Sequence, residues 1–311
     1  AFYKVTESIY RAHHVETPAD MQGAAQPADQ PQEEEIHKQE EQLPYQQQIG
    51  NYHLLKLIGQ GSFAEVFLGK HRYLKTLAAI KLLHAHVLFE SAGAFEQEAQ
   101  MIASLRHPHI IRILDFGVEQ NKPFLIMDYA PRDTLRKAHP RGQLLPPHQV
   151  LSYIKQVASA LQYAHDNRVV HRDVKPENML LEEDGKVVLS DFGIAIPAHN
   201  TATMKTQEIT GTIAYMAPEQ FQGKARPASD QYALAIVLYE WLCGRLPFEG
   251  SSWLEIAMRQ INDLPPAPRA IVPTLSPLLE EVILKALSKD YQQRFASIQT
   301  FARAFEQACN G

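Results

Sequence analysis

The chain has 311 residues, of which 45% are hydrophobic and 21% are charged, a balance typical of soluble globular proteins with a sizeable core. The net charge of -5 and the pI of about 6.3 argue against a nucleic-acid-binding surface, which needs a clustered excess of lysine and arginine. No apolar run approaches the length of a membrane span, about 18 residues or more. The two cysteines are expected to be reduced thiols in a cytoplasmic protein, although one disulfide is an alternative.

The first 48 residues differ in composition from the rest of the chain. From Pro18 to Gln48 they are rich in Gln, Glu, Ala and Pro, with three consecutive glutamates at positions 33–35. Such a segment cannot bury enough apolar surface to offset the entropy lost on ordering. We therefore expect a flexible leader over residues 1–48, with a partner-binding tail as the alternative, and a folded domain over residues 49–308.

The first part of the domain, residues 49–128, shows strand patterns interrupted by one helix. The helix is predicted over about 91–105, where Phe95, Ala99 and Ile102 form an apolar face. Five strands are predicted from apolar and β-branched runs, at 52–58, 64–68, 77–82, 111–116 and 124–127. Together these elements predict a small, mainly antiparallel sheet with one main helix.

The second part, residues 129–308, is mostly helical in pattern. Apolar residues at steps of three and four predict an amphipathic helix over 148–167, and a hairpin with a turn at Asp184-Gly185 follows it. The run 232–243 is apolar nearly all round, which is typical of a helix buried on every side. Further helices are predicted near 252–261, 276–287 and 297–308. The expected fold is α+β with two lobes that meet near residues 128–133.

A glycine turn from Gly59 to Val66 links the first two predicted strands. A link between two strands argues against a dinucleotide site of the Rossmann type, and the chain has no P-loop motif. Because Gly59 and Gly61 lack side chains, the backbone amides of this turn can approach phosphate oxygens closely. An ordinary hairpin turn is the alternative reading of the same glycines.

A lysine and a glutamate in the first lobe are candidates for an ion pair. Lys81 ends the apolar run Ala78-Ala79-Ile80, and Glu98 falls on the apolar face of the predicted helix. A carboxylate on a buried face needs a cation, because leaving it unpaired is costly. We therefore expect Lys81 to pair with Glu98, although a lysine at the end of a strand is often only a surface group.

The densest cluster of polar residues runs from His171 to Asn178. Pro176 prevents a regular helix there, so the segment is predicted as a loop between a long helix and the hairpin. Asp191-Phe192-Gly193 follows directly after that hairpin. Two carboxylates and an amide around one loop can hold Mg²⁺ and orient a hydroxyl group. A charged loop is often only solvated surface, but here each element occurs where the next one requires it.

These motifs occur in a fixed order and are followed by Ala217-Pro218-Glu219. Over about residues 52–305 the chain resembles the eukaryotic-type (Hanks-type) protein kinases, and in particular their bacterial members. The resemblance implies a bilobal kinase fold and an ATP- and Mg²⁺-dependent transfer of the γ-phosphoryl group to proteins. The segments around Lys175 and Thr212 have the form found in serine/threonine kinases, which implies a non-specific protein serine/threonine kinase. One departure is Ala64 at the third glycine position.

The same resemblance assigns roles to individual residues. Asp173 would accept or orient the substrate hydroxyl, and Lys175 would neutralise charge on the transferred phosphoryl group. Lys81 would hold the α- and β-phosphates and pair with Glu98, while Asn178 and Asp191 would bind magnesium. The residues expected to contact ATP are Ile58, Gly59, Gln60, Gly61, Ser62, Val66, Ala79, Lys81, Met127, Asp128, Ala130, Asn178, Leu180 and Asp191.

Supporting contacts also follow from the resemblance. Glu219 would pair with Arg294 beneath the site, and Asp230 would anchor the backbone of the catalytic loop. The adenine would lie between Ile58, Val66, Ala79 and Leu180, with its polar edge at the backbone of residues 128 and 130 and Met127 behind it.

Activation by autophosphorylation is expected, because Arg172 precedes Asp173 and such an arginine binds a phosphate on the activation loop in this family. The candidate sites are Thr201, Thr203, Thr206 and Thr210, with Thr203 or Thr206 preferred. Protein substrates bearing Ser or Thr and a homodimer for autophosphorylation are the expected partners. A pseudokinase that only binds ATP as a scaffold is the main alternative, and a small-molecule phosphotransferase is a second one.

Overall fold

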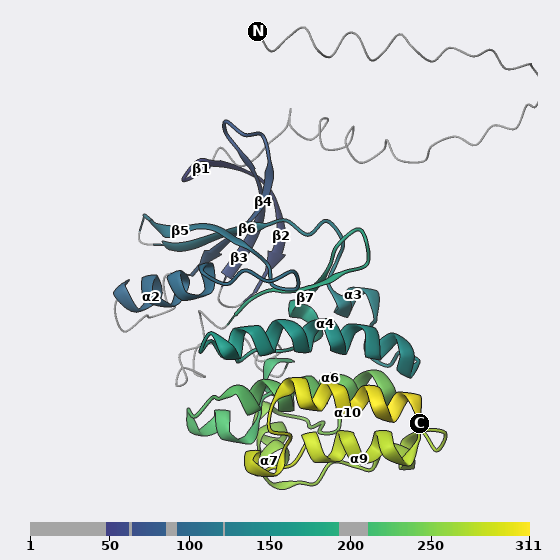
Figure 1. Ribbon diagram of the computed structural model, residues 1–311. Helices are drawn as coiled ribbons and strands as arrows, with labels where there is room; N and C mark the ends of the chain where they lie inside the picture. The colour runs from purple at the N-terminus through teal and green to yellow at the C-terminus, as the bar shows by residue number, and fades with distance from the viewer. Residues whose placement is uncertain (1–47, 62–63, 85–91, 121, 193–210) are drawn as a thin grey trace, which may run out of the picture. The chain divides into compact units, whose positions relative to one another are not determined.

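The computed structural model describes residues 48–61, 64–84, 92–120, 122–192 and 211–311. The first lobe is an antiparallel sheet of six strands in the order β1-β2-β3-β4-β6-β5, and helix α2 (Ala92–Ala103) packs against β5 (Figure 1). The strands are β1 (Gln48–Ile49), β2 (Tyr52–Gln60), β3 (Ala64–His71), β4 (Leu77–Leu83), β5 (Ile113–Glu119) and β6 (Lys122–Asp128).

Strand β4 shows how the sequence fixes this lobe. Its side chains alternate between two hydrophobic clusters, with Ala78, Ile80 and Leu82 in one and Ala79 and Leu83 in the other, as the two-residue period of a strand requires. The cluster that contains Ala79 and Leu83 also contains residues of α2 and of the helical lobe. Because Lys81 has the same parity as Ala79 and Leu83, its side chain lies on the face of the sheet directed toward the site.

The second lobe is mainly helical. It begins after β6 with the short helix α3 (Leu135–Ala138), and its long helix α4 (Pro147–Asp166) leads into the polar loop. The loop ends in a 3₁₀ turn, η2 (Pro176–Asn178), and in the two-stranded hairpin β7 (Met179–Leu181) and β8 (Val187–Leu189). The later elements are η4 (Pro218–Gln222), α6 (Pro227–Cys243), α7 (Trp253–Asn262), α8 (Pro268–Ile271), α9 (Pro277–Ala286), η5 (Tyr291–Gln293) and α10 (Ile298–Asn310).

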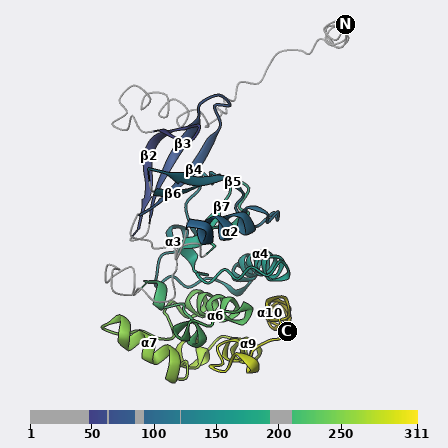
Figure 2. The same cartoon turned by 90° about the vertical axis from the view of Figure 1, so that its left-hand side faces the viewer.

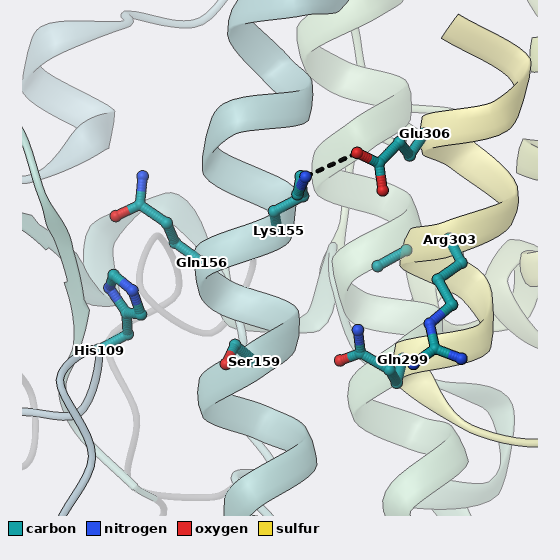
Figure 3. A pocket seen from close by; sticks show the side chains of 8 residues that line it. His109, Lys155, Gln156, Ser159, Gln299, Arg303 and Glu306 are labelled. Atoms are coloured by element: carbon teal, nitrogen blue, oxygen red, sulfur yellow. Dashed lines mark hydrogen bonds and ion pairs between the residues drawn. The ribbon is translucent and has the colours of Figure 1, made fainter. Parts of the chain in front are cut away.

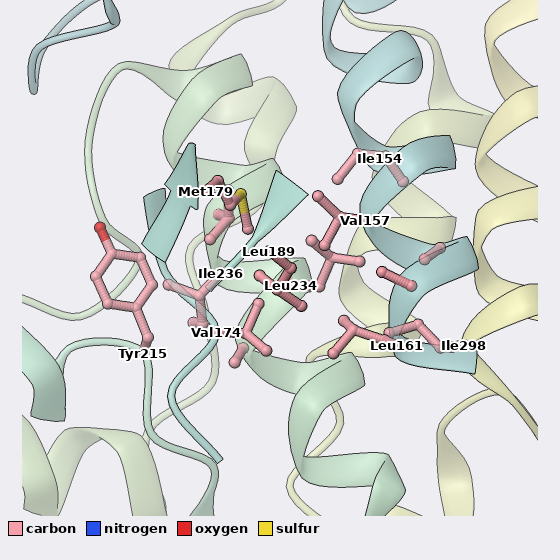
Figure 4. Packing of buried hydrophobic residues seen from close by; sticks show 14 of the residues in the cluster. Ile154, Val157, Leu161, Val174, Met179, Leu189, Tyr215, Leu234, Ile236 and Ile298 are labelled. Carbon is pink, nitrogen blue, oxygen red and sulfur yellow. The ribbon is translucent and has the colours of Figure 1, made fainter. Parts of the chain in front are cut away.

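Helix α6 forms the centre of this lobe. Its residues from Ser229 to Cys243 are all buried, and α4, α9 and α10 pack against it. Figure 4 shows the apolar side chains of α4 and α6 meeting those of the hairpin, with Ile154, Leu189 and Leu234 among them. In the described part of the chain, no helix is long and apolar enough to cross a membrane. The apolar character of α6 accords with the burial of its side chains in this lobe.

The predicted α+β fold with two lobes is confirmed, and each predicted helix and strand is present. Most ends agree within about two residues, but β3 and β5 extend three residues beyond their predicted ends, and α6 begins at Pro227, five residues before the apolar run. The two-residue strand β1 and the four-residue helices α3 and α8 were not predicted. Both cysteines are free, while a cytoplasmic location stays a prediction. The predicted leader, Ser62 and the four threonines at positions 201–210 lie outside the described residues, apart from Gln48 at the leader's end.

Candidate active site

The polar loop after α4 is anchored from below by Asp230 of α6, as predicted. One oxygen of this buried carboxylate accepts from the backbone N–H of His171 at 2.9 Å, and the other accepts from that of Arg172 at 2.8 Å. The His165 Nε2 atom lies 2.7 Å from the same carboxylate. Hydrogen bonds to a charged acceptor are stronger than neutral ones, so the start of the loop is held firmly to the core helix.

His171 links this loop to β8 and is fully buried. Its Nε2 lies 2.9 Å from the carbonyl oxygen of Ser190, and its Nδ1 accepts from the N–H of Asp173 at 3.2 Å. Because a carbonyl only accepts and an amide N–H only donates, His171 is neutral with its proton on Nε2. Burial lowers the pKa of His171, although the negative charges of Asp230 and Asp173 act to raise it. Its ring packs against Phe192 with the ring centres 4.5 Å apart.

Asp173, Lys175 and Asn178 meet in one hydrogen-bonded cluster. Lys175 Nζ lies 2.8 Å from Asp173 Oδ2 and donates to the Thr212 hydroxyl at 2.9 Å. Asn178 Nδ2 donates to Asp173 Oδ2 at 2.9 Å and to its backbone oxygen at 2.8 Å. Burial acts to raise the pKa of Asp173, but the charge and hydrogen bond of Lys175 lower it more, so the pKa lies below its usual value. Asp173 is therefore a charged acceptor at neutral pH.

Asp191 lies just after β8 and contacts the first lobe. Lys81 Nζ donates to Asp191 Oδ1 at 2.8 Å, so residues 110 positions apart join the two lobes at the site. Asp191 has a backbone φ of 59°, a left-handed conformation that non-glycine residues seldom adopt and that often occurs at functional sites. Asp191 also acts electrostatically on Lys175, so this carboxylate belongs to the same site as Asp173.

The predicted pair between Lys81 and Glu98 is not formed in this structure. Lys81 pairs with Asp191, while Glu98 accepts from Arg172 Nη1 at 3.1 Å. Burial raises the pKa of Glu98, and Arg172 only partly offsets this effect. Glu98 is paired with a cation as expected, but that cation is Arg172 and not Lys81. The sequence could not show that Asp191 competes for Lys81 and that Arg172 takes its place beside Glu98.

The predicted adenine contacts mostly fall in one region. Ala79 and Met127 belong to the main hydrophobic cluster, and Val66 and Leu180 pack against it from the two lobes. Ile58 is exposed and lies outside that cluster. The N–H of Asp128 donates to the Arg112 carbonyl at 3.0 Å. Among the described residues, the N–H of Ala130 has no hydrogen-bond partner.

The predicted pair of Glu219 and Arg294 is confirmed. Two guanidinium nitrogens of Arg294 donate to the two carboxylate oxygens of Glu219, at 2.7 and 2.9 Å, and both side chains are buried. Burial raises the pKa of Glu219, but the hydrogen bond and charge of Arg294 lower it more. Next to Glu219, Gln220 Nε2 donates to the carbonyl of Arg172 at 2.9 Å. The pair of Glu219 and Arg294, together with Gln220, holds the segment after Thr212 beneath the polar loop.

A second buried network was not predicted from the sequence. Arg136 of α3 donates to Glu177 at 2.8 Å and to both oxygens of Glu240, and it also contacts the hydroxyl of Tyr215. Tyr215 in turn donates to Glu240 at 2.6 Å. The network links Glu177 of the polar loop to Tyr215 through Arg136. No local pattern could have found it, because Arg136 and Glu240 are 104 positions apart and α3 has only four residues.

A polar cavity of 340 Å³ lies between α4 and α10, apart from these residues (Figure 3). Seven of its eight lining side chains are polar, and Lys155 and Glu306 pair across it at 2.6 Å. None of its lining residues belongs to the predicted site. The candidate site is therefore the cluster around Asp173 and Asp191.

The chain matches the protein kinase domain family over residues 52–306. It is 36% identical over 253 residues to the serine/threonine-protein kinase PrkC of Bacillus subtilis, covering 80% of this chain and 39% of PrkC. It is 33% identical over 254 residues to the probable serine/threonine-protein kinase PknB of Lactococcus lactis, covering 80% of this chain and 40% of that protein. It is 37% identical over 278 residues to the serine/threonine-protein kinase PknF of Mycobacterium tuberculosis, covering 85% of this chain and 57% of PknF. The chain thus spans about two fifths of the length of the first two relatives.

Proposed function

This chain belongs to the protein kinase family, and we propose that it transfers the γ-phosphoryl group of ATP to serine or threonine hydroxyls of proteins with Mg²⁺ as cofactor. One observation carries the proposal. Lys175 bonds both to Asp173 and to the hydroxyl of Thr212, and the charge of Asp191 acts on the same lysine. These contacts support a shared role of Asp173, Lys175 and Asp191 in the proposed transfer.

The residues present fit magnesium. Both hydrogen bonds of the Asn178 side chain use its nitrogen, so its amide oxygen is free to bind a cation. Asp191 supplies a partly exposed carboxylate, which pairs with Lys81. The described residues contain no cluster of three or more His, Cys, Asp or Glu that could hold a metal. Two oxygen ligands suit Mg²⁺, which usually retains waters and binds substrate phosphates. The metal would neutralise the charge of the phosphates.

The residues present also fit a nucleotide. The apolar surface formed by Val66, Ala79 and Leu180 suits a flat base, and the unpaired N–H of Ala130 can donate to its edge. The turn at Gly59 and Gly61 and the ammonium of Lys81 would hold the phosphates. ATP supplies the phosphoryl group, and the side chains of this chain orient it.

The catalytic loop can orient the acceptor hydroxyl. With its pKa lowered by Lys175, Asp173 is ionised at neutral pH and can accept a hydrogen bond from a serine or threonine hydroxyl. Lys175 is held between Asp173 and Thr212, where its charge can stabilise the developing negative charge. The names of the relatives as serine/threonine kinases support the choice of acceptor.

We further propose that the observed pairing is a resting state. Arg172 pairs with Glu98 through Nη1, and a phosphate would compete with Glu98 for this guanidinium. A phosphothreonine in the activation loop, at position 203 or 206, would offer Arg172 a stronger partner. Glu98 would then be free to pair with Lys81, and Lys81 would leave Asp191 to the metal.

No observation favours the pseudokinase alternative, because Lys81, Asp173 and Asp191 are all present in the chain and Lys81 pairs with Asp191. The test is intact-mass spectrometry of the purified protein after incubation with ATP and Mg²⁺, with Asp173→Asn as the control. We expect mass gains of one or more phosphates in the parent protein only. If neither protein gains mass and a generic protein substrate is not phosphorylated either, the proposal is wrong.

A further inference from the structure

The polar cavity between α4 and α10 has the size and the lining of a small-molecule site. Figure 2 shows these two helices side by side in the helical lobe, and Figure 3 shows the side chains that line the cavity. Its volume of 340 Å³ falls in the range of small-molecule pockets, about 300 to 1,000 Å³. Ala302 is the one apolar side chain among the eight described residues that line it. The cavity therefore suits a hydrophilic ligand and not a lipid tail or a flat base.

Helix α10 supplies two hydrogen-bond donors that have no protein partner. In the part of the chain that the structure describes, neither the guanidinium of Arg303 nor the side-chain amide of Gln299 makes a hydrogen bond or an ion pair. The lining charges of Lys155 and Glu306 pair with each other at 2.6 Å, so the charge of Arg303 is left uncompensated. An arginine binds a carboxylate or a phosphate through two parallel hydrogen bonds, which predicts an anionic group on the ligand.

Helix α4 supplies a third donor, the hydroxyl of Ser159. The Nδ1 atom of His107 accepts from the N–H of His109 at 3.1 Å, and burial lowers the pKa of His107. The neutral ring therefore carries its proton on Nε2, which donates to Ser159 Oγ at 3.1 Å. Because the oxygen of Ser159 accepts this bond, its own proton is free to bond to a ligand. Three donors suit the three oxygens of a phosphate monoester better than the two oxygens of a carboxylate.

Two other lining groups are acceptors. His109 Nδ1 lies 2.8 Å from the carbonyl oxygen of Val187, and because a carbonyl only accepts, Nδ1 carries the proton and Nε2 of the neutral ring is an acceptor. Lys155 bonds to Oε1 of Glu306, and Oε2 has no partner among the described residues. Hydroxyl groups are suitable donors to both atoms. The ligand is therefore expected to combine an anionic group with hydroxyls.

The cavity is connected to the hairpin of β7 and β8 through Val187. The N–H of Val187 donates to Gln156 Oε1 at 2.9 Å and its carbonyl accepts from His109, so two lining side chains hold both backbone groups. The N–H of Leu189 also donates to the His109 carbonyl at 2.9 Å. A ligand that immobilises His109 favours the state in which these bonds are made. Its binding therefore restrains the hairpin, which ends just before Asp191.

We propose that this cavity binds a small polyol that carries a phosphate monoester, the chemical class of a sugar phosphate, and that its binding restrains the hairpin of β7 and β8. The phosphate oxygens accept from Arg303, Gln299 and Ser159, and the hydroxyls of the polyol donate to His109 and Glu306. This site is separate from the one that would bind ATP, and binding to it does not depend on the proposed kinase function.

Isothermal titration calorimetry of the whole chain tests the site, with glucose 6-phosphate as the probe. We expect a Kd below about 1 mM, binding of inorganic phosphate that is at least about tenfold weaker, and no binding of glucose. Arg303→Met should weaken the binding of the probe at least about tenfold and Ser159→Ala about fivefold, because the first removes a charged hydrogen bond and the second a neutral one. Arg269→Met, at an exposed arginine of α8, is the matched control and should bind the probe like the parent.

Hydrogen–deuterium exchange tests the link to the hairpin. Saturating glucose 6-phosphate should slow the exchange of residues 179–189 at least about twofold in the parent and leave it unchanged in Arg303→Met at the same concentration. A non-hydrolysable ATP analogue should not displace the probe, because the two sites are separate. Neither measurement needs phosphoryl transfer, so a protein that binds the probe but phosphorylates nothing contradicts the proposed function and supports this site.

The proposal is overturned if the probe does not bind at up to about 10 mM, or if the parent and Arg303→Met bind it equally. Equal affinity for inorganic phosphate would show that the polyol makes no contact, and tighter binding of a phosphoserine peptide would identify a protein ligand instead. Displacement of the probe by the ATP analogue would place it in the nucleotide site. Unchanged exchange of the hairpin at saturation would refute the restraint.

Discussion

The catalytic loop and helix α2 border the same site, but they are held by different kinds of contact. The loop is fixed through buried groups, namely Asp230 below it and the pair of Glu219 and Arg294, whose side chains are 7 and 0% exposed. Glu98 of α2 contacts the loop through one pair with Arg172, with side chains 34 and 42% exposed. Exposed pairs contribute little to stability, while breaking a buried pair is costly. The lower half of the site is therefore rigid, and the upper half is free to change partners.

The largest effect is expected from removing the charge of Asp173. Asp173→Asn should lower the kcat for a peptide substrate by about 100- to 10,000-fold, because an amide cannot accept the proton or orient the hydroxyl as a carboxylate does. ATP affinity, measured by calorimetry, should stay close to the parent value, since Asp173 is not an expected ATP contact. A variant that retains a tenth or more of the parent kcat would contradict the assigned role.

Breaking the buried pair in the rigid half should mainly affect stability. Arg294→Met leaves the Glu219 carboxylate buried and unpaired, so we expect the free energy of unfolding to fall by about 3–5 kcal/mol in urea denaturation. The double variant Glu219→Gln with Arg294→Met should recover part of that loss, because it removes the unpaired charge. A loss below about 1 kcal/mol in the single variant would show that this half is not held as described.

The opposite pattern is expected for Glu98. Glu98→Gln should change the free energy of unfolding by less than about 1 kcal/mol, since only a partly exposed pair is lost. In the phosphorylated protein it should lower kcat about 100-fold by misplacing Lys81, and Glu98→Asp should restore part of the activity. A Glu98→Gln protein with full activity after phosphorylation would refute the proposed exchange of partners.

A pH-dependent effect is expected from Lys289, which holds the end of α7. Its Nζ donates to the Gln260 carbonyl at 2.6 Å and lies 3.9 Å from the centre of the Phe248 ring. Burial lowers the pKa of Lys289 to about 8, whereas the lysine of an unfolded chain titrates near 10.5. Between these values the unfolded state binds more protons, so the contribution of Lys289 to stability rises as the pH increases and is lost as the pH falls toward 8.

Thermal unfolding of the parent and of Lys289→Met at pH 7, 8, 9 and 10 checks this sign. The Tm of the parent should rise relative to that of the variant from pH 8 to pH 10, while groups common to both proteins cancel. A difference that stays constant or falls over this range would show that Lys289 is not desolvated in the folded protein.

The same contrast explains how far the sequence could predict the molecule. Apolar periodicity predicted the long helices and the sheet, since α4 and α6 bury residues at the positions that their patterns indicate. The resemblance to the kinase family predicted the contacts of Asp230 with the loop backbone and of Glu219 with Arg294, and the structure contains both. The resemblance could not predict the partner of Glu98, for which Lys81 and Arg172 compete, nor the network of Arg136, whose partners are distant in the chain.

The most direct test of the exchange is a crystal structure of the phosphorylated protein with a non-hydrolysable ATP analogue and Mg²⁺. We predict that Lys81 Nζ lies within about 4 Å of the Glu98 carboxylate, that Arg172 binds the phosphothreonine, and that Asp191 and Asn178 bind the metal. The catalytic loop should keep its hydrogen bonds to Asp230. A phosphorylated, active protein in which Glu98 still pairs with Arg172 would contradict the account.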